Sequence, residues 1–135
     1  MQTVIKNILN LDLGKGLSGI CLLSSVLNPE QRRLVPIDFQ VEHILPQKWE
    51  HYKYNGWDNS TFNQYHEKLG NLVVLEKTLN IKSSHRFFAE KKNYYNRSEI
   101  HDVRELGSLR EWTPIELKER HKKVIEKLTN FLSEQ

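Results

Sequence analysis

The sequence contains a single cysteine and has neither a long apolar run nor a glycine-rich phosphate loop. Cys21 cannot form a disulfide within the chain, which predicts a reducing, cytoplasmic setting and argues against a cysteine-based zinc site. No run of about 18 apolar residues is present, so neither a membrane-spanning helix nor a membrane partner is expected. The N-terminus lacks a secretion signal, and its glycines do not have the spacing of a nucleotide-binding loop.

The chain has 135 residues, of which 38% are hydrophobic, enough for one domain with one core. Its formal net charge is +3, from 20 basic and 17 acidic residues. Residues 81–135 contribute 12 Lys and Arg against 9 Asp and Glu, whereas residues 41–80 contribute 4 against 5. This mild, uneven excess of positive charge is compatible with a polyanionic partner, but charge of this size is weak evidence for one.

Two apolar strands and a short helix are predicted in the middle of the chain. The segment Phe39–Leu45 alternates in polarity at its start, and Pro46 ends it because proline cannot donate to a ladder. The segment Leu72–Leu75 is a compact apolar strand, and residues 76–81 are expected to form a helix. Together these segments predict a ββα unit with an insertion between its strands.

Further helices are predicted in the insertion and after the ββα unit. Ser60 is suited to cap the start of a helix that ends before Gly70, which fits the position after a helix C-terminus. Ser83 or Ser84 is suited to begin another helix, which runs to about Tyr95.

A long C-terminal helix begins at Thr113-Pro114-Ile115-Glu116, where Thr is the N-cap, Pro the first helical residue and Glu the capping-box partner. The predicted fold is therefore α+β and mostly helical. Residues 1–36 form an N-terminal segment, either packed on the core or a linker remnant. Residues 37–135 form the domain, with the ββα core over about 38–82 and a helical remainder over 83–135.

Four polar residues fall at the ends of these elements. His43 has a side-chain pKa near neutrality and can act as a general base. Glu42 and the amide of Asn80 offer oxygen ligands to a hard cation such as Mg²⁺. Asn71 is placed to hold either the backbone of the first segment or the His43 ring. Such a set can hydrolyse a phosphodiester, yet each residue alone also fits an ordinary surface, turn or helix position.

Glu42 and His43 are neighbours, and successive side chains of a strand point to opposite faces. For both side chains to reach one cation or phosphate, the backbone between Val41 and Pro46 has to bend or bulge. The sequence therefore predicts an irregular strand end at this point.

These residues carry a resemblance to a known family. The motif Glu42-His43-Ile44-Leu45-Pro46-Gln47, followed by Gly70-Asn71-Leu72 and Asn80, is similar to the His-Asn-Asn version of the HNH (ββα-metal, His-Me finger) endonuclease motif. With the stretch Phe88–Ser98, the chain resembles the C-terminal nuclease domain of GmrSD-type modification-dependent restriction enzymes over roughly residues 38–130. The resemblance implies a ββα-metal core with flanking helices.

The resemblance also implies a role for each motif residue. Glu42 and Asn80 would hold one divalent cation, with Mg²⁺ first and Mn²⁺ or others as alternatives. His43 would be the general base, and Asn71 would orient it. His85 stands where many relatives carry an asparagine, and its role stays open between a third metal ligand, a phosphate contact and a helix-start residue.

Three basic residues are candidates for contact with nucleic acid. The resemblance assigns Lys91 to a phosphate, and the adjacent Lys92 is a second candidate. A solvated helix face is the alternative for this pair, and pairing with a core carboxylate is the alternative for Arg120. Four aromatic residues of the insertion fit either stacking on unpaired bases or a small satellite core: Trp49, Tyr52, Tyr54 and Trp57.

The function implied by the resemblance is metal-dependent hydrolysis of DNA phosphodiester bonds, in defence against foreign or modified DNA. The alternatives are a nucleic-acid-binding module that does not cleave, and a fragment of a larger NTP-dependent restriction enzyme. DNA is the expected partner, and a second copy of the chain is a possible one, because one site cuts one strand. An N-terminal NTP-using domain does not fit into residues 1–36, which favours a free-standing relative, an excised domain or one subunit of a split system.

Overall fold

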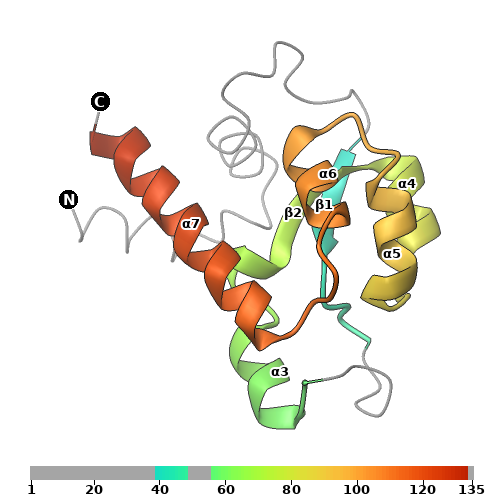
Figure 1. Ribbon diagram of the computed structural model, residues 1–135, viewed down its shortest axis with the longest axis horizontal. Coiled ribbons are helices and arrows are strands. Elements are labelled where there is room, and N and C mark those ends of the chain that lie inside the picture. The colour runs from blue at the N-terminus through green and yellow to red at the C-terminus, as the bar shows by residue number, and fades with distance from the viewer. Residues whose placement is uncertain (1–38, 49–55, 134–135) are drawn as a thin grey trace.

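The computed structural model describes residues 39–48 and 56–133, which form an α+β fold that is mostly helical (Figure 1). This confirms the predicted fold class. In chain order the elements are β1 (Phe39–His43), α3 (Asn59–Tyr65), the 3-10 turn η2 (Leu69–Asn71), β2 (Leu72–Glu76), α4 (Lys77–Ser83), α5 (Phe88–Tyr95), α6 (His101–Gly107) and α7 (Pro114–Ser133).

The two strands form a regular antiparallel pair. They match one to one, from Phe39 opposite Glu76 to His43 opposite Leu72. The irregularity predicted around the acid–histidine pair is therefore wrong within the strand, and the chain bends only from Ile44 onward. The first four residues of β2 are all buried, and a strand that is buried in this way fixes its pairing register.

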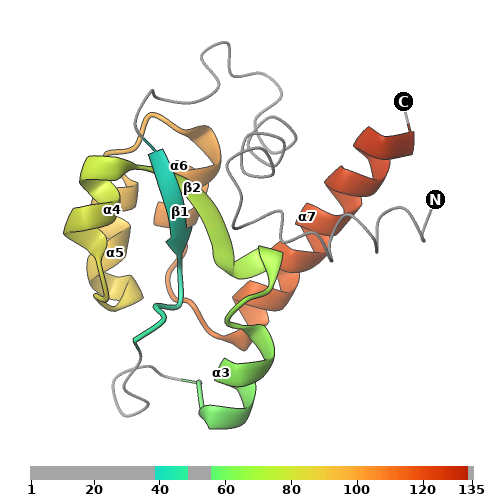
Figure 2. The ribbon, with the colours of Figure 1, turned by 180° about the vertical axis from the view of Figure 1, so that it is seen from behind.

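Helices cover the sheet and its ends. The helix α4 packs on both strands, α5 packs against α4 and α6, and α7 packs against η2. Figures 1 and 2 show the sheet between the α4–α5 pair and α7. The main core includes both strands, and a second cluster of buried residues joins η2 and the start of β2 to α7: Leu69, Leu72, Val124 and Leu128.

The start of α3 differs by two residues from the prediction. Asp58, rather than Ser60, is the N-cap: its carboxylate accepts a hydrogen bond from the Thr61 N–H at 2.8 Å, and the Thr61 hydroxyl accepts one from the Asp58 N–H at 3.0 Å. A carboxylate also suits the positive end of the helix dipole. Gly70 lies within η2, four residues beyond His66, the C-cap of α3, so the prediction that Gly70 directly follows this helix is wrong.

The start of α5 was also predicted too early. Ser83 is the last residue of α4, and Ser84 ends that helix with a positive φ of 40°. The helix α5 begins at Phe88, after Phe87 in an extended conformation. The Ser83 side chain is fully buried, and its hydroxyl donates to Glu42 and to the last turn of α4, so it does not cap the next helix.

The predicted start of α7 is confirmed. The Thr113 hydroxyl accepts a hydrogen bond from the Ile115 N–H at 3.2 Å, and the Glu116 carboxylate accepts one from the Thr113 N–H at 2.7 Å. The Thr113 hydroxyl also donates to that carboxylate. Glu116 thus reaches back to Thr113 as the prediction required, Thr113 caps the second helical residue, and Pro114 occupies the first helical position.

Part of the sequence-based interpretation lies outside the described residues: the N-terminal segment 1–36 and three of the four aromatic residues of the insertion. The fourth, Trp57, is 6% exposed, and its indole N–H donates to the Trp112 carbonyl at 2.8 Å, which places it in the core. Within the described ranges, no helix combines the length and the apolar character needed to cross a bilayer.

Candidate active site

The carboxylate of Glu42 is buried, with 3% of the residue exposed, and is held by three donors on one oxygen. Oε2 accepts hydrogen bonds from the Ser83 hydroxyl at 2.8 Å and the Tyr95 hydroxyl at 2.9 Å, and the Lys91 ammonium lies 3.2 Å away. The other oxygen, Oε1, accepts a longer hydrogen bond from the Asn80 amide at 3.3 Å. The donors on Oε2 fix the carboxylate plane and turn Oε1 toward Asn80.

Lys91 lies inside the protein, with 0% of the residue exposed. Besides its ion pair with Glu42, its ammonium donates to the His43 carbonyl oxygen at 2.7 Å. Burial lowers the pKa of Lys91, while the Glu42 carboxylate acts in the opposite direction. In this conformation the ammonium serves Glu42 and the end of β1, whereas the half-buried Lys92 is the member of the pair that reaches solvent.

The phenol of Tyr95 is kept neutral by its surroundings. Burial first, and then the Glu42 charge, raise the pKa of Tyr95 well above its usual range. A neutral phenol keeps the proton that it donates to Glu42 in the hydrogen bond of 2.9 Å.

Asn71 is fully buried and uses the whole hydrogen-bonding capacity of its amide. Its oxygen accepts from the Leu45 N–H at 2.8 Å and from the Trp112 indole N–H at 3.2 Å. Its nitrogen donates to the carbonyl oxygens of Leu45 at 3.1 Å and His66 at 2.8 Å. Asn71 therefore holds the backbone that follows His43, the first of the two arrangements considered from the sequence.

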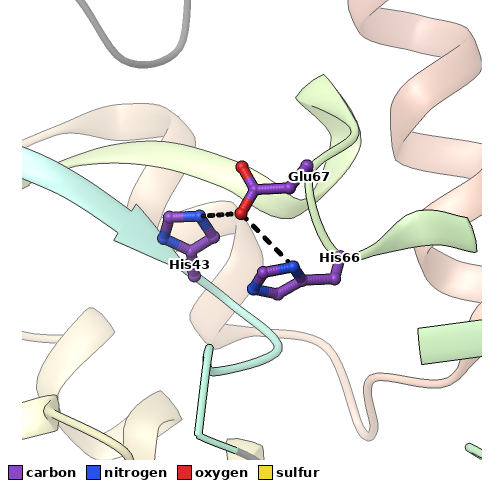
Figure 3. A group of neighbouring side chains, drawn as sticks. All are labelled: His43, His66 and Glu67. Carbon is purple, nitrogen blue, oxygen red and sulfur yellow. Dashed lines mark ion pairs between the residues drawn. The ribbon is translucent and has the colours of Figure 1, made fainter. Parts of the chain in front are cut away.

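The imidazole of His43 lies at the end of β1, on the side of the strand away from the Glu42 donors. It stacks on the His66 ring, with 5.2 Å between ring centroids. Nε2 faces the Glu67 carboxylate at 3.5 Å, and Nδ1 points away from it (Figure 3). Desolvation by burial is the largest of several opposing effects and lowers the pKa of His43, which favours the neutral ring.

Glu42 and His43 nevertheless meet at one cavity of about 370 Å³, at the junction of β1 and α4. Asn80 and His85 also line it. The structure thus brings together both predicted metal ligands, the predicted base and the residue of open role. The lining is completed by the following residues: Val41, Pro46, Gln47, Ile81 and Ser84.

Arg120 lies elsewhere, within the fold. Its guanidinium forms a bidentate pair with the Asp102 carboxylate at 2.8 and 2.9 Å and donates to the Leu72 carbonyl oxygen at 3.0 Å. This matches the alternative that the sequence left open, pairing with a core carboxylate.

Sequence reasoning missed four residues that surround the site. Ser83 and Tyr95 donate to Glu42, and His66 and Glu67 flank His43. Tyr95 lies within the stretch Phe88–Ser98 that contributed to the family resemblance, which was a usable signal. The other three lie at ordinary helix ends, and only the tertiary fold reveals their partners.

The fold and the site define a small α+β domain with a carboxylate, an imidazole and an amide around one cavity. The chain matches the family model described as GmrSD restriction endonucleases, C-terminal domain, over residues 6–127, and it belongs to this family. The match confirms the family resemblance and includes most of the N-terminal segment 1–36. Membership supports a nuclease function. Comparisons with curated proteins and with solved structures gave no match.

Proposed function

We propose that this domain is an HNH-type endonuclease of the ββα-metal class, which hydrolyses DNA phosphodiester bonds with one divalent cation and His43 as general base. The observation that carries this proposal is the cavity at the junction of β1 and α4, where Glu42, His43 and Asn80 meet. In this proposal β1, β2 and α4 are the ββα unit, and α3 and η2 form the insertion between its strands.

The donors at this cavity fit a hard cation. Glu42 Oε1 and the Asn80 amide lie 3.3 Å apart, and both residues offer oxygen ligands once the amide presents its oxygen. Donors that hold the second oxygen of a ligating carboxylate orient it for metal binding. A bound cation such as Mg²⁺ would offset negative charge on the scissile phosphate. His85 is exposed on the same cavity and is better suited to a phosphate than to Mg²⁺, which prefers oxygen.

The environment of His43 suits a general base. The Glu67 carboxylate, 3.5 Å from Nε2, favours the tautomer with its proton on that nitrogen. Nδ1 is then the nitrogen with a lone pair, and it can accept a proton from a water molecule. Asn71 acts as a positioning residue, because it holds the backbone directly after His43.

The first test is the variant His43→Ala, assayed for Mg²⁺-dependent nicking of plasmid DNA. Loss of a general base costs roughly 10²- to 10⁴-fold in rate, and we expect a loss in this range with an unchanged circular dichroism spectrum. His101→Ala, at an exposed histidine of α6, is the matched control and should keep full activity. Full activity of His43→Ala would disprove the role of the base.

The same plasmid assay, run with several divalent cations, separates cleavage from binding alone. DNA retardation on a gel without cleavage under any cation would favour the alternative of a non-cleaving module. An N-terminal NTP-using domain or subunit and a second copy of the chain are proposed partners, and their requirement is tested by adding them to this assay.

A further inference from the structure

A second group of metal-binding side chains lies on the side of β1 away from the Glu42 donors. The rings of His43 and His66 both turn toward the Glu67 carboxylate (Figure 3). Glu67 Oε1 is 3.5 Å from Nε2 of His43 and 3.3 Å from Nδ1 of His66, and the three ligand atoms all lie within 4.8 Å of one another.

These distances match a tetrahedral zinc site. Zinc binds nitrogen and carboxylate oxygen at about 2.0–2.2 Å, so neighbouring ligand atoms of a tetrahedron are about 3.4 Å apart. The two distances to Glu67 already have this length. The third edge, between the two imidazole nitrogens, is at most 4.8 Å and shortens when an ion binds.

The chemistry of the ligands favours zinc over the cation proposed for the neighbouring cavity. Two imidazoles and one carboxylate form a known zinc ligand set, whereas Mg²⁺ prefers oxygen. Nε2 of His43 is buried, and in the part of the chain that the structure describes its contact with Glu67 at 3.5 Å does not have the geometry of a hydrogen bond. The Glu67 side chain is 43% exposed, so an ion can enter from its side.

The cluster is also held in place before any ion binds. The His66 ring stacks on Phe62, with 4.6 Å between centroids, and on His43. The His66 carbonyl oxygen accepts a hydrogen bond from the buried Asn71 amide. Ligands that are preorganised in this way bind a metal without a large cost of ordering.

We propose that His43, His66 and Glu67 form a zinc-binding site that switches off the nuclease centre. A neutral imidazole has one nitrogen with a lone pair and one with a proton. If zinc takes the lone pair on Nε2 of His43, the proton must move to Nδ1, and the ring can no longer act as a base. The inhibitory effect rests on the proposed function, whereas zinc binding itself does not.

Binding is tested on the full chain by calorimetric titration with Zn²⁺ in the presence of millimolar Mg²⁺. We expect one tight site, and a tetrahedral visible absorption spectrum when Co²⁺ replaces Zn²⁺. His66→Phe keeps the stacked ring but removes the ligand nitrogen, and Glu67→Gln removes the carboxylate. Changes beside the ligands of a metal site cost roughly 10- to 100-fold in affinity, so both variants should lose at least about tenfold.

His101→Ala is the matched control, because His101 forms an exposed pair with Glu105 at 3.0 Å on the surface of α6. It should retain the affinity of the unchanged protein. Equal Zn²⁺ affinity in the unchanged protein and in His66→Phe, or an octahedral Co²⁺ spectrum, would overturn the site.

Inhibition is tested by nicking activity at rising Zn²⁺ in excess Mg²⁺, with each variant normalised to its own activity without zinc. The zinc concentration for half inhibition should be at least about tenfold higher in His66→Phe than in the unchanged protein. Tight zinc binding without inhibition would overturn the switch. A protein that binds zinc but never cleaves DNA would instead contradict the proposed nuclease function.

Discussion

The ion pair between Glu42 and Lys91 determines how the carboxylate is presented at the cavity. Both side chains are buried, and the ammonium also reaches the His43 carbonyl oxygen. A single side chain thus supports the predicted metal ligand and the strand end that carries the predicted base. Removing either charge would leave the other buried without its partner, which is more damaging than removing both.

We therefore predict that Lys91→Met lowers the free energy of unfolding by about 3–5 kcal/mol, measured by urea denaturation. The double variant Glu42→Gln/Lys91→Met should lose less than the sum of the two single changes. Glu90→Gln breaks the exposed pair with Arg86 and should leave the midpoint nearly unchanged. Strictly additive effects of Glu42→Gln and Lys91→Met would contradict a coupled buried pair.

Residue types could be predicted from the sequence more easily than their partners. The motif indicated Glu42, His43, Asn71 and Asn80, and all four lie at the end of β1 or directly against it. Several of their partners are brought in by contacts across 26 to 53 residues of sequence, as for Leu45 with Asn71 and Tyr95 with Glu42, which no local pattern encodes. The burial of Lys91 is of this kind.

Gly70 allows η2 to lie very close to α7, because it has no side chain at the point of contact. A Cβ atom at Gly70 would lie 2.6 Å from the Cβ and 2.8 Å from the backbone of His121, so no other residue fits here without moving a helix. The Gly70 N–H donates to Nδ1 of His121 at 3.1 Å, which requires a histidine without a proton on that nitrogen. Burial first, and Lys68 second, lower the pKa of His121.

This lowered pKa predicts a dependence of stability on pH. The unfolded chain takes up the His121 proton more readily than the folded protein does, so the contribution is fully present above about pH 6.5 and is lost as pH falls through the lower folded pKa. His121→Asn offers an acceptor that does not titrate, and its stability should fall less steeply with pH over this range. Thermal denaturation between pH 5 and 8 measures the difference. Identical slopes of stability against pH in both proteins would exclude this role of His121. The slope that remains in His121→Asn includes a contribution from His43, whose pKa is also lowered.

Elements with local signals were predicted well, and those without them were not. The start of α7 depends on four consecutive residues, and β2 on a short apolar run, so both were evident in the sequence. The start of α5 was missed because Ser83, a good cap by type, is used by Glu42 instead. The regular end of β1 was missed because the expected distortion was inferred from chemistry rather than from the backbone.

At the scale of the molecule, Arg120 joins three elements. From α7 it holds Asp102 of α6 with two hydrogen bonds and the Leu72 carbonyl oxygen of β2 with a third. The Arg120 and Asp102 side chains are 11% and 9% exposed. The C-terminal helix is thereby tied to the strand that pairs with the site-bearing β1.

We predict that Arg120→Lys lowers the free energy of unfolding by roughly 1.5–3 kcal/mol although the charge is kept, because a lysine cannot reproduce the planar bidentate geometry. Chemical denaturation measures this loss, and Lys122→Arg, at an exposed position of α7, is the control. Unchanged stability together with weaker DNA binding would instead place Arg120 at the nucleic-acid surface.

The regular ladder of β1 has a consequence for how such a site can change. Because Glu42 and His43 lie on alternate sides of one strand, the carboxylate depends on α4 and α5, and the imidazole depends on the end of α3. Substitutions at the end of α3 can therefore alter the surroundings of His43, the proposed base, while the Glu42 carboxylate keeps its donors. The surroundings of the Glu42 carboxylate and those of the His43 imidazole can therefore change independently in related sequences, while β1 keeps the two residues adjacent.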